Sequence, residues 1–285
     1  MTGSRGPLVS FVGAGPGATD LLTLRAIRVL EEADIVVWAR SLIDEGILEF
    51  VREDAETLPS DGLTLEDVAD IYARAAEEGL HVARIQSGDP AVYGSVHEQM
   101  QICMRLGLPW EIVPGVSSLG AAAAALGQEL TVPDLSQTLI LTRKPVRTSM
   151  PQNEKLVELA RHGTTLVLFL SIRRPRELQQ DLLDGGYAED TPCAVVYRAS
   201  WPDEVVIRCP LSELGQSIRD AKLTTHSLIL VGPALAADTM PGARSSTYDP
   251  CFAHRFRKRR PEQKRALDGM PGKGVPVDHA SEPAP

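Results

Sequence analysis

Short apolar runs alternate with stretches of helical spacing along the first 115 residues, and this alternation limits the possible folds more than any other feature. Runs that suit buried strands lie at 7–12, 35–38, 80–85 and 110–115. Stretches of helical spacing lie between them at 21–33, 65–79 and 95–106. Thr19 or Asp20 is expected to cap the first helix, and Gly79 and Gly107 to end two later ones. Strands that alternate with helices predict a doubly wound α/β domain with a parallel sheet.

The second half of the chain repeats these segment types with one difference. Strands are predicted at 137–143, 164–170, 193–199, 204–208 and 227–232, with helices at 153–162, 175–185 and 211–221. Two of these strands are separated only by the turn 200–203, so we expect them to be antiparallel. The second sheet is therefore predicted to be mixed.

These patterns predict two α/β domains and an extension. The first domain is placed at 7–115 and the second at 116–240. Residues 241–285 are rich in Pro, Gly and charge, so they are expected to be largely disordered beyond about 260. The sequence gives this tail no role.

The composition limits which binding partners and which cellular compartment are expected for this chain. The chain of 285 residues has a formal net charge of −9, which argues against a nucleic-acid partner because phosphate contacts need a basic face. It has no apolar stretch of ~20 residues, and its first residues lack an apolar signal region, so we expect a cytoplasmic protein with no membrane contact. The four cysteines stand far apart and are expected to be reduced thiols.

A glycine-rich loop, Gly13-Ala14-Gly15-Pro16-Gly17, follows the first predicted strand. A dinucleotide fold would place the fingerprint G-x-G-x-x-G here, but this loop is one residue short and Pro16 lacks a backbone N–H. The second strand ends in Trp38-Ala39-Arg40, without the acidic residue that holds a ribose. A nicotinamide enzyme is therefore disfavoured. A tight turn that lets a flat ligand approach the backbone and a turn without a ligand both stay open.

Other catalytic patterns are incomplete. A nucleophile elbow has the pattern G-x-S-x-G, but the segment 115–120 has Leu119 at the place of the second glycine. The segment 97–101 lacks the second histidine of a zinc-protease helix. His81 and His162 stand alone and are expected at the surface. The sequence predicts neither a metal site nor a nucleophilic triad.

Three further stretches follow the glycine loop along the chain, namely Ser87-Gly88-Asp89-Pro90-Ala91-Val92-Tyr93-Gly94, 113–118 and 130–138. With the loop and residues 21–26, they resemble the tetrapyrrole methyltransferase family, which uses S-adenosylmethionine. Residues 140–143, 168–171, 195–204 and 248–258 are similar to the branch that methylates C11 of precorrin-4 to give precorrin-5 in cobalamin (vitamin B12) biosynthesis. Ala18 departs from the family's usual aspartate. Trp38-Ala39-Arg40 stands where the uroporphyrinogen-III branch has Tyr-Asp-Arg.

The resemblance implies two α/β domains with the cofactor in a cleft between them, and a glycine loop that lies near the reacting centre rather than around a phosphate. Carried over by position, the cofactor-binding residues are Pro16, Ser87, Gly88, Asp89, Val92, Ser117, Ser118, Leu170 and Ala199. The candidate substrate-binding residues are Gly15, Arg143, Arg147 and Arg173, with Lys144, Arg174 and Arg176 as further cations for the carboxylates of a precorrin. The resemblance also implies a homodimer.

The expected chemistry is alignment. A sulfonium is a strong methyl donor, and positioning a ring carbon in line with it can supply ~7–11 kcal/mol of the barrier. No catalytic base is named. Asp89 is expected to accept hydrogen bonds from ribose hydroxyls or from the cofactor's ammonium group. Two alternatives stay open: methylation of cobalt-precorrin-4 or of another tetrapyrrole carbon, and a non-catalytic carrier of corrinoid intermediates.

Overall fold

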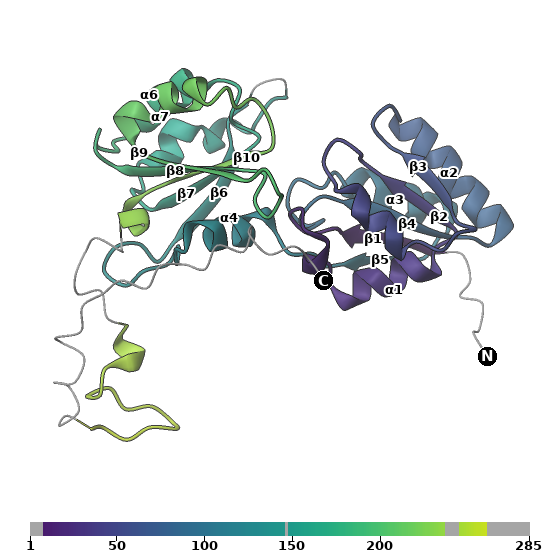
Figure 1. Cartoon of the computed structure of the whole chain (residues 1–285), viewed down its shortest axis with the longest axis horizontal. Helices are drawn as coiled ribbons and strands as arrows, with labels where there is room; N and C mark the ends of the chain where they lie inside the picture. The colour runs from purple at the N-terminus through teal and green to yellow at the C-terminus, as the bar shows by residue number, and fades with distance from the viewer. Residues whose placement is uncertain (1–7, 146–147, 237–244, 261–285) are drawn as a thin grey trace. The chain divides into compact units, whose positions relative to one another are not determined.

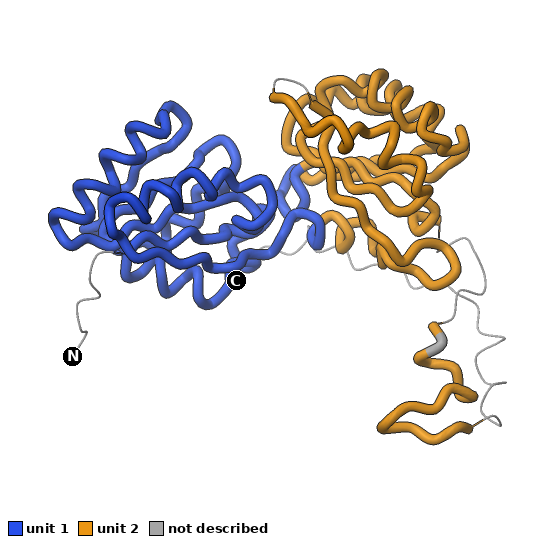
Figure 2. Tube along the Cα trace, turned by 180° about the vertical axis from the view of Figure 1, so that it is seen from behind, with its two compact units in different colours: residues 1–121, 198–203 blue, residues 122–197, 204–285 orange. Residues whose placement is uncertain are grey.

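The computed structural model describes residues 8–145, 148–236 and 245–260. The chain divides into two compact units (Figure 2). Unit 1 comprises Met1–Ala121 together with Arg198–Asp203, and unit 2 comprises Ala122–Tyr197 together with Glu204–Pro285. The division falls within helix α4 (Ser118–Leu126). Arg147 and the tail after residue 260 lie outside the described residues.

Unit 1 is built on a parallel sheet, as the sequence predicts (Figure 1). Its strands lie in the order β3-β2-β4-β1-β5. Their bounds are β1 Leu8–Gly13, β2 Ile35–Trp38, β3 Glu56–Pro59, β4 His81–Gln86 and β5 Trp110–Val113. The central strands are buried along most of their length because helices cover both faces of the sheet.

The edge strand β3 is absent from the sequence prediction. It pairs with β2 from Glu56 to Pro59, yet most of its residues are exposed and it has no apolar run. Such a short, polar edge strand gives no periodic signal, because its place in the sheet comes from backbone pairing.

Three helices pack on this sheet, α1 (Leu24–Glu32), α2 (Leu65–Glu78) and α3 (His97–Leu106). Gly79 and Gly107 end α2 and α3 in the left-handed conformation, as predicted. The predicted cap of α1 is wrong. Thr19–Leu21 form a separate 3-10 turn, and the side chain of Thr23 caps α1 by accepting from the N–H of Ala26 at 3.1 Å.

The core of unit 1 has two layers. Side chains of α1, such as Leu30, pack on one face of the sheet, while side chains of α2 and α3, such as Tyr72 and Cys103, pack on the other. His81 is 3% exposed, so its expected surface position is wrong. Its Nε2 lies 2.9 Å from the hydroxyl of Ser10, which also donates to Glu111, so this polar group is buried with partners.

Unit 2 is built on a mixed sheet, again as predicted. Its strands lie in the order β6-β7-β10-β8-β9, with β6 and β7 parallel and the other neighbours antiparallel. Their bounds are β6 Leu139–Arg143, β7 Thr165–Phe169, β8 Pro192–Tyr197, β9 Val205–Pro210 and β10 Ser227–Val231. As a result, the ends of β6, β7 and β8 and the start of β10 meet at one edge of this sheet.

Helices α5 (Leu156–Ala160), α6 (Pro175–Asp184) and α7 (Leu211–Asp220) cover one face of the mixed sheet (Figure 1). Buried leucines of α6 and α7 meet side chains of β7, β8 and β10 in a single core. Pro175 opens α6, where its missing N–H costs nothing. Among the described residues, no helix is long and apolar enough to span a bilayer.

Candidate functional site

Three loops meet at the carboxyl ends of β1, β4 and β5, and glycines make this meeting possible. A Cβ on Gly115 would lie 2.2 Å from the carbonyl oxygen of Gly88, and a Cβ on Gly13 would lie 2.5 Å from Cα of Gly115. Both distances are shorter than any ordinary contact with a backbone atom. We call Gly13, Gly15, Gly88 and Gly115 the glycine junction.

Two loops of the junction are paired through their backbones. The N–H of Gly88 donates to the carbonyl of Gly15 at 2.7 Å, and the N–H of Gly15 donates back to Gly88 at 3.2 Å. Both residues have positive φ values, +75° for Gly15 and +67° for Gly88, which glycine adopts at no steric cost. The junction thus fixes the predicted cofactor residues Pro16 and Asp89 on adjacent loops.

The carboxylate of Asp89 ties the loop after β5 to the loop after β4. One of its oxygens accepts from the N–H of Ala91 at 2.8 Å, which forms a tight turn, and the other accepts from the N–H of Gly115 at 3.0 Å. Each carboxylate oxygen can accept a further hydrogen bond. Asp89 therefore organises the junction through two bonds and keeps acceptor capacity for a ligand.

A tryptophan 185 residues away in sequence holds the glycine loop. The indole N–H of Trp201 donates to the carbonyl of Pro16 at 2.9 Å, and a Cβ on Gly17 would lie 2.2 Å from the indole ring. The hydroxyl of Ser200 accepts from the N–H of Ala18 at 3.1 Å. These contacts explain why Arg198–Asp203, which we call the tryptophan turn, groups with unit 1.

The tryptophan turn is itself braced. The guanidinium of Arg198 lies 3.9 Å from the centre of the Trp201 ring and forms an ion pair with Asp203 at 2.6 Å. Arg198 and Ser200 both have positive φ values, which is uncommon for residues with a Cβ. Ala199, a predicted cofactor residue, lies between them and is buried. Sequence reasoning aligned Ala199 with the family but missed its tryptophan neighbour, because only the fold brings Trp201 to Pro16.

Other predicted cofactor residues surround the junction. Ser118 begins α4, and its backbone nitrogen lies 3.5 Å from the position of a Cβ on Gly88. The hydroxyl of Ser117 accepts from the N–H of Leu119 at 3.3 Å. Ser87 is exposed, and Val92 is half-buried one turn beyond Asp89. With Ala199 of the tryptophan turn, the structure therefore brings eight predicted cofactor residues together in unit 1, namely Pro16, Ser87, Gly88, Asp89, Val92, Ser117, Ser118 and Ala199.

The residues at the junction fit a neutral, polar ligand such as an adenosyl group. Gln86, the last residue of β4, has a buried amide nitrogen with no hydrogen-bond partner among the described residues. An unpaired buried donor of this kind is costly and suits a ligand acceptor. The serine hydroxyls, the Asp89 carboxylate and the packed glycine backbone complete a set of neutral donors and strong acceptors. Sequence reasoning missed Gln86, which has no motif of its own.

In unit 2, the predicted residues gather at the edge where β6 and β7 end. Leu170 is 66% exposed with a φ of +53°, so its apolar side chain faces outward from a strained turn. The guanidinium of Arg143 donates to the carbonyl of Ser149 at 2.8 Å and so holds its own loop. Arg173 is exposed.

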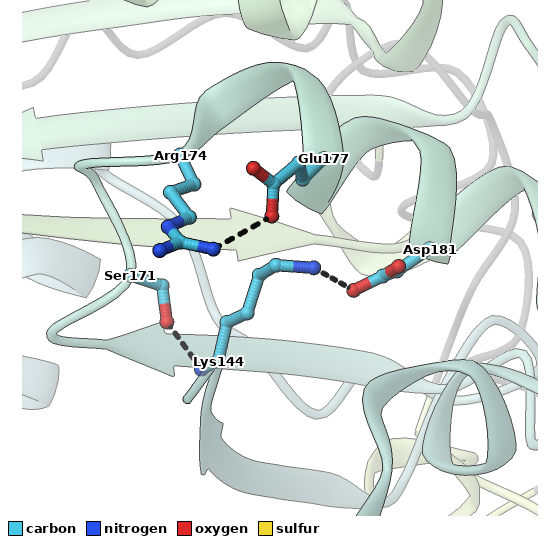
Figure 3. A network of polar contacts seen from close by, with 5 residues as sticks. All are labelled: Lys144, Ser171, Arg174, Glu177 and Asp181. Atoms are coloured by element: carbon cyan, nitrogen blue, oxygen red, sulfur yellow. Dashed lines mark hydrogen bonds and ion pairs between the residues drawn. The ribbon is translucent and has the colours of Figure 1, made fainter. Parts of the chain in front are cut away.

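Lys144 does not act as a free cation at this edge (Figure 3). Its ammonium is paired with the carboxylate of Asp181, and its side chain is only 11% exposed. Its backbone N–H donates to the hydroxyl of Ser171 at 2.7 Å. Arg174 is paired with Glu177 at 3.3 Å. Both residues therefore have carboxylate partners on α6. Among the described residues, no cluster of three His, Cys, Asp or Glu side chains suits a metal ion.

Comparison with known proteins identifies the family. The model of the tetrapyrrole (corrin/porphyrin) methylases matches residues 8–215. The chain belongs to this family.

Its relatives include C11-methyltransferases of both substrate types. It is 41% identical to the cobalt-precorrin-4 C(11)-methyltransferase of Methanocaldococcus jannaschii, over 88% of this chain and 96% of that one. It is also 41% identical to the precorrin-4 C(11)-methyltransferase of Pseudomonas aeruginosa, over 87% of this chain and 98% of that one.

Solved structures agree with the fold. The crystal structure of a cobalt precorrin-4 methyltransferase matches with a TM-score of 0.78 and 42% identity, covering 80% of this chain and 95% of that one. The uroporphyrin-III C-methyltransferase of Thermus thermophilus, solved in complex with S-adenyl homocysteine, matches with a TM-score of 0.69 and 31% identity. It covers 80% of this chain and 99% of that one. The α/β fold with one parallel and one mixed sheet is thus confirmed.

Proposed function

We propose that this protein transfers the methyl group of S-adenosylmethionine to C11 of precorrin-4, giving precorrin-5 in cobalamin biosynthesis. The observation that carries the proposal is the identity of 41–42% to C11-methyltransferases over nearly their whole length. A siroheme synthase, by comparison, is 32% identical over 48% of its own length.

S-adenosylmethionine supplies a methyl group that is already activated by its sulfonium. The chain's own residues then have to bind and orient. Gly15 and Gly88 let a ligand approach the backbone closely, Asp89 offers carboxylate lone pairs, and Gln86 offers an unpaired amide N–H. Holding both reactants in a fixed orientation accounts for a large share of the rate in such a reaction.

The residues assigned to the cofactor are the eight gathered in unit 1 together with Leu170 of unit 2. Those assigned to the substrate are Gly15, Arg143, Arg147 and Arg173. The junction loops are held by backbone pairing and by the hydrogen bonds of the Asp89 and Trp201 side chains, which supports a binding site of fixed shape. We also propose that the protein is a homodimer, which light scattering at the concentration of the assay tests directly.

The test is an incubation of the purified protein with S-adenosylmethionine carrying a ¹³C-labelled methyl group. Precorrin-4 and cobalt-precorrin-4 are supplied in parallel reactions, because the chain is equally similar to enzymes named for each. We expect the label at C11, located by NMR of the product. Label at another carbon would refute the C11 assignment, and tetrapyrrole binding without any transfer would indicate a carrier.

A further inference from the structure

Unit 2 has a cavity of about 850 Å³ whose lining is strongly basic. It lies between the N-terminal end of α6 and the C-terminal end of α7, two helices packed side by side. Five cations line it, Arg173, Arg174, Arg176, Arg219 and Lys222, against one carboxylate, Glu177. We call this set the basic cavity. Its volume falls within the range of small-molecule sites.

The charges of the basic cavity are largely uncompensated. Glu177 is paired with Arg174 at 3.3 Å. Within the described parts of the chain, Arg173, Arg176 and Lys222 form no ion pair, and the guanidinium of Arg219 donates to the neutral side chain of Gln216. The Nη1 atom of Arg219 is buried and has no hydrogen-bond partner there. In a protein whose formal net charge is −9, such a local excess of cations favours a multiply charged anion.

The cavity is not lined by charge alone. Ile172 and Ile218 are buried beneath it, and Pro175 and Leu223 contribute further apolar surface. An inorganic anion gains nothing from apolar walls, whereas a ligand with an apolar ring and carboxylate arms uses both parts. Guanidinium groups are also suited to bidentate pairing with carboxylates.

The position of the cavity connects it to the proposed reaction. Arg173 follows Leu170 by three residues, so their Cα atoms are at most about 11 Å apart. The loop of Lys222 precedes β10, which begins at the same edge of the sheet where β7 ends. The basic cavity and the predicted cofactor residue Leu170 therefore share one edge of unit 2.

We infer that the basic cavity binds carboxylate arms of the tetrapyrrole substrate, with Arg173, Arg176, Arg219 and Lys222 as the cations that pair with them. This inference rests on the proposed function for the identity of the ligand. It adds Arg219 and Lys222, which sequence reasoning did not select, and it places Arg173 in a defined cavity.

The test uses uroporphyrin III, a macrocycle with several carboxylates, as the probe in the absence of S-adenosylmethionine. Binding is followed by fluorescence titration of the wild type, the double variant R176Q/K222Q and the control K155Q. Arg176, Lys222 and Lys155 are all exposed, and Lys155 lies outside the cavity. Each lost charge-assisted bond is expected to weaken binding about tenfold.

The double variant loses two such bonds and is therefore expected to bind uroporphyrin about a hundredfold more weakly than K155Q. The methyl ester of uroporphyrin is expected to bind neither the double variant nor K155Q. Equal binding by the double variant and K155Q would overturn the inference. Displacement of uroporphyrin by inorganic phosphate at constant ionic strength would also overturn it, because it would indicate a site for small anions.

A second measurement separates this inference from the proposed function. With precorrin-4 as substrate, R176Q/K222Q is expected to raise KM for the tetrapyrrole while the Kd for S-adenosylmethionine stays unchanged. If no methyl transfer occurs with any substrate, the proposed function fails. The uroporphyrin titration still decides whether the basic cavity binds a polycarboxylate.

Discussion

The glycine junction of unit 1 and the basic cavity of unit 2, the two sites proposed for ligands, are built by opposite means. At the junction, Gly13, Gly88 and Gly115 bring three backbones into contact, and backbone groups take part in every hydrogen bond that fixes the loops. At the basic cavity, long and mostly exposed side chains such as Arg176 and Lys222 supply the binding groups.

This difference matches the chemistry proposed for the two ligands. A methyl donor has to be held in one orientation, which a rigid backbone site provides. A polycarboxylate macrocycle has to be neutralised, and adaptable cations provide that at the cost of salt sensitivity. The two regions should therefore respond differently to mutation and to salt.

The largest expected effect comes from breaking the junction with Gly115→Ala. The added Cβ would lie 2.2 Å from a backbone oxygen, and overpacking of this kind costs about 1–3 kcal/mol in free energy of unfolding. We expect a lower melting temperature and no measurable binding of S-adenosylmethionine by calorimetry.

The matched control is Gly120→Ala within α4, where nothing lies within 4 Å of a Cβ. Because alanine suits a helix better than glycine, the Gly120→Ala change is expected to raise the free energy of unfolding by about 0.5–1 kcal/mol. Wild-type binding by the Gly115 variant would show that the junction is not the site.

A smaller effect is expected from Asp89→Ala. The change leaves the N–H groups of Ala91 and Gly115 without their acceptor, which costs about 1–3 kcal/mol. Calorimetry should show S-adenosylmethionine binding weakened by about tenfold or more. Asp89→Asn keeps an acceptor oxygen, so its Kd for S-adenosylmethionine is expected to lie between those of the wild type and the alanine variant. Unchanged affinity of the alanine variant would remove this carboxylate from the site.

A still smaller effect is expected from Trp201→Phe. This variant keeps an aromatic ring beside Gly17 but loses the hydrogen bond to the carbonyl of Pro16. A neutral hydrogen bond contributes about 0.5–1.5 kcal/mol, so the Kd for S-adenosylmethionine should rise about two- to twelvefold. Trp110→Phe, at a residue that is 39% exposed in β5, is the control. Identical Kd values for the two variants would mean that the tryptophan turn does not support the cofactor loop.

The smallest effect is expected from salt, and it compares the two regions in one experiment. Raising the salt from about 0.1 M to 1 M shortens the Debye length from about 10 Å to 3 Å, which weakens exposed charge pairs. The Kd for uroporphyrin should rise clearly, while the Kd for S-adenosylmethionine should change much less. Equal salt dependence of both ligands would contradict the distinction between a backbone site and a charge site.

Much of this arrangement could be predicted because strong local patterns carry it. The apolar runs of β1, β4 and β7 and the glycines that end α2 and α3 are visible in sequence because each depends on a few neighbouring residues. The glycine loop is visible in the sequence for the same reason. Its role in close packing with Gly115 depends on how the strands are arranged.

The rest depends on contacts between distant residues. Thr23 rather than Asp20 caps α1 because the intervening residues form a 3-10 turn, which propensity does not reveal. Trp201 contacts Pro16 across 185 residues, and His81 is buried because Ser10 on the next strand offers it a partner. The basic cavity likewise forms only when α6 packs on α7.

A crystal of this protein soaked with S-adenosylhomocysteine would show whether the methyl donor binds at the glycine junction, as proposed. We expect ligand density against Gly15 and Pro16, the turn Ser87 to Asp89, and Ser117. Density for the ligand at any other place on the chain would contradict this proposal.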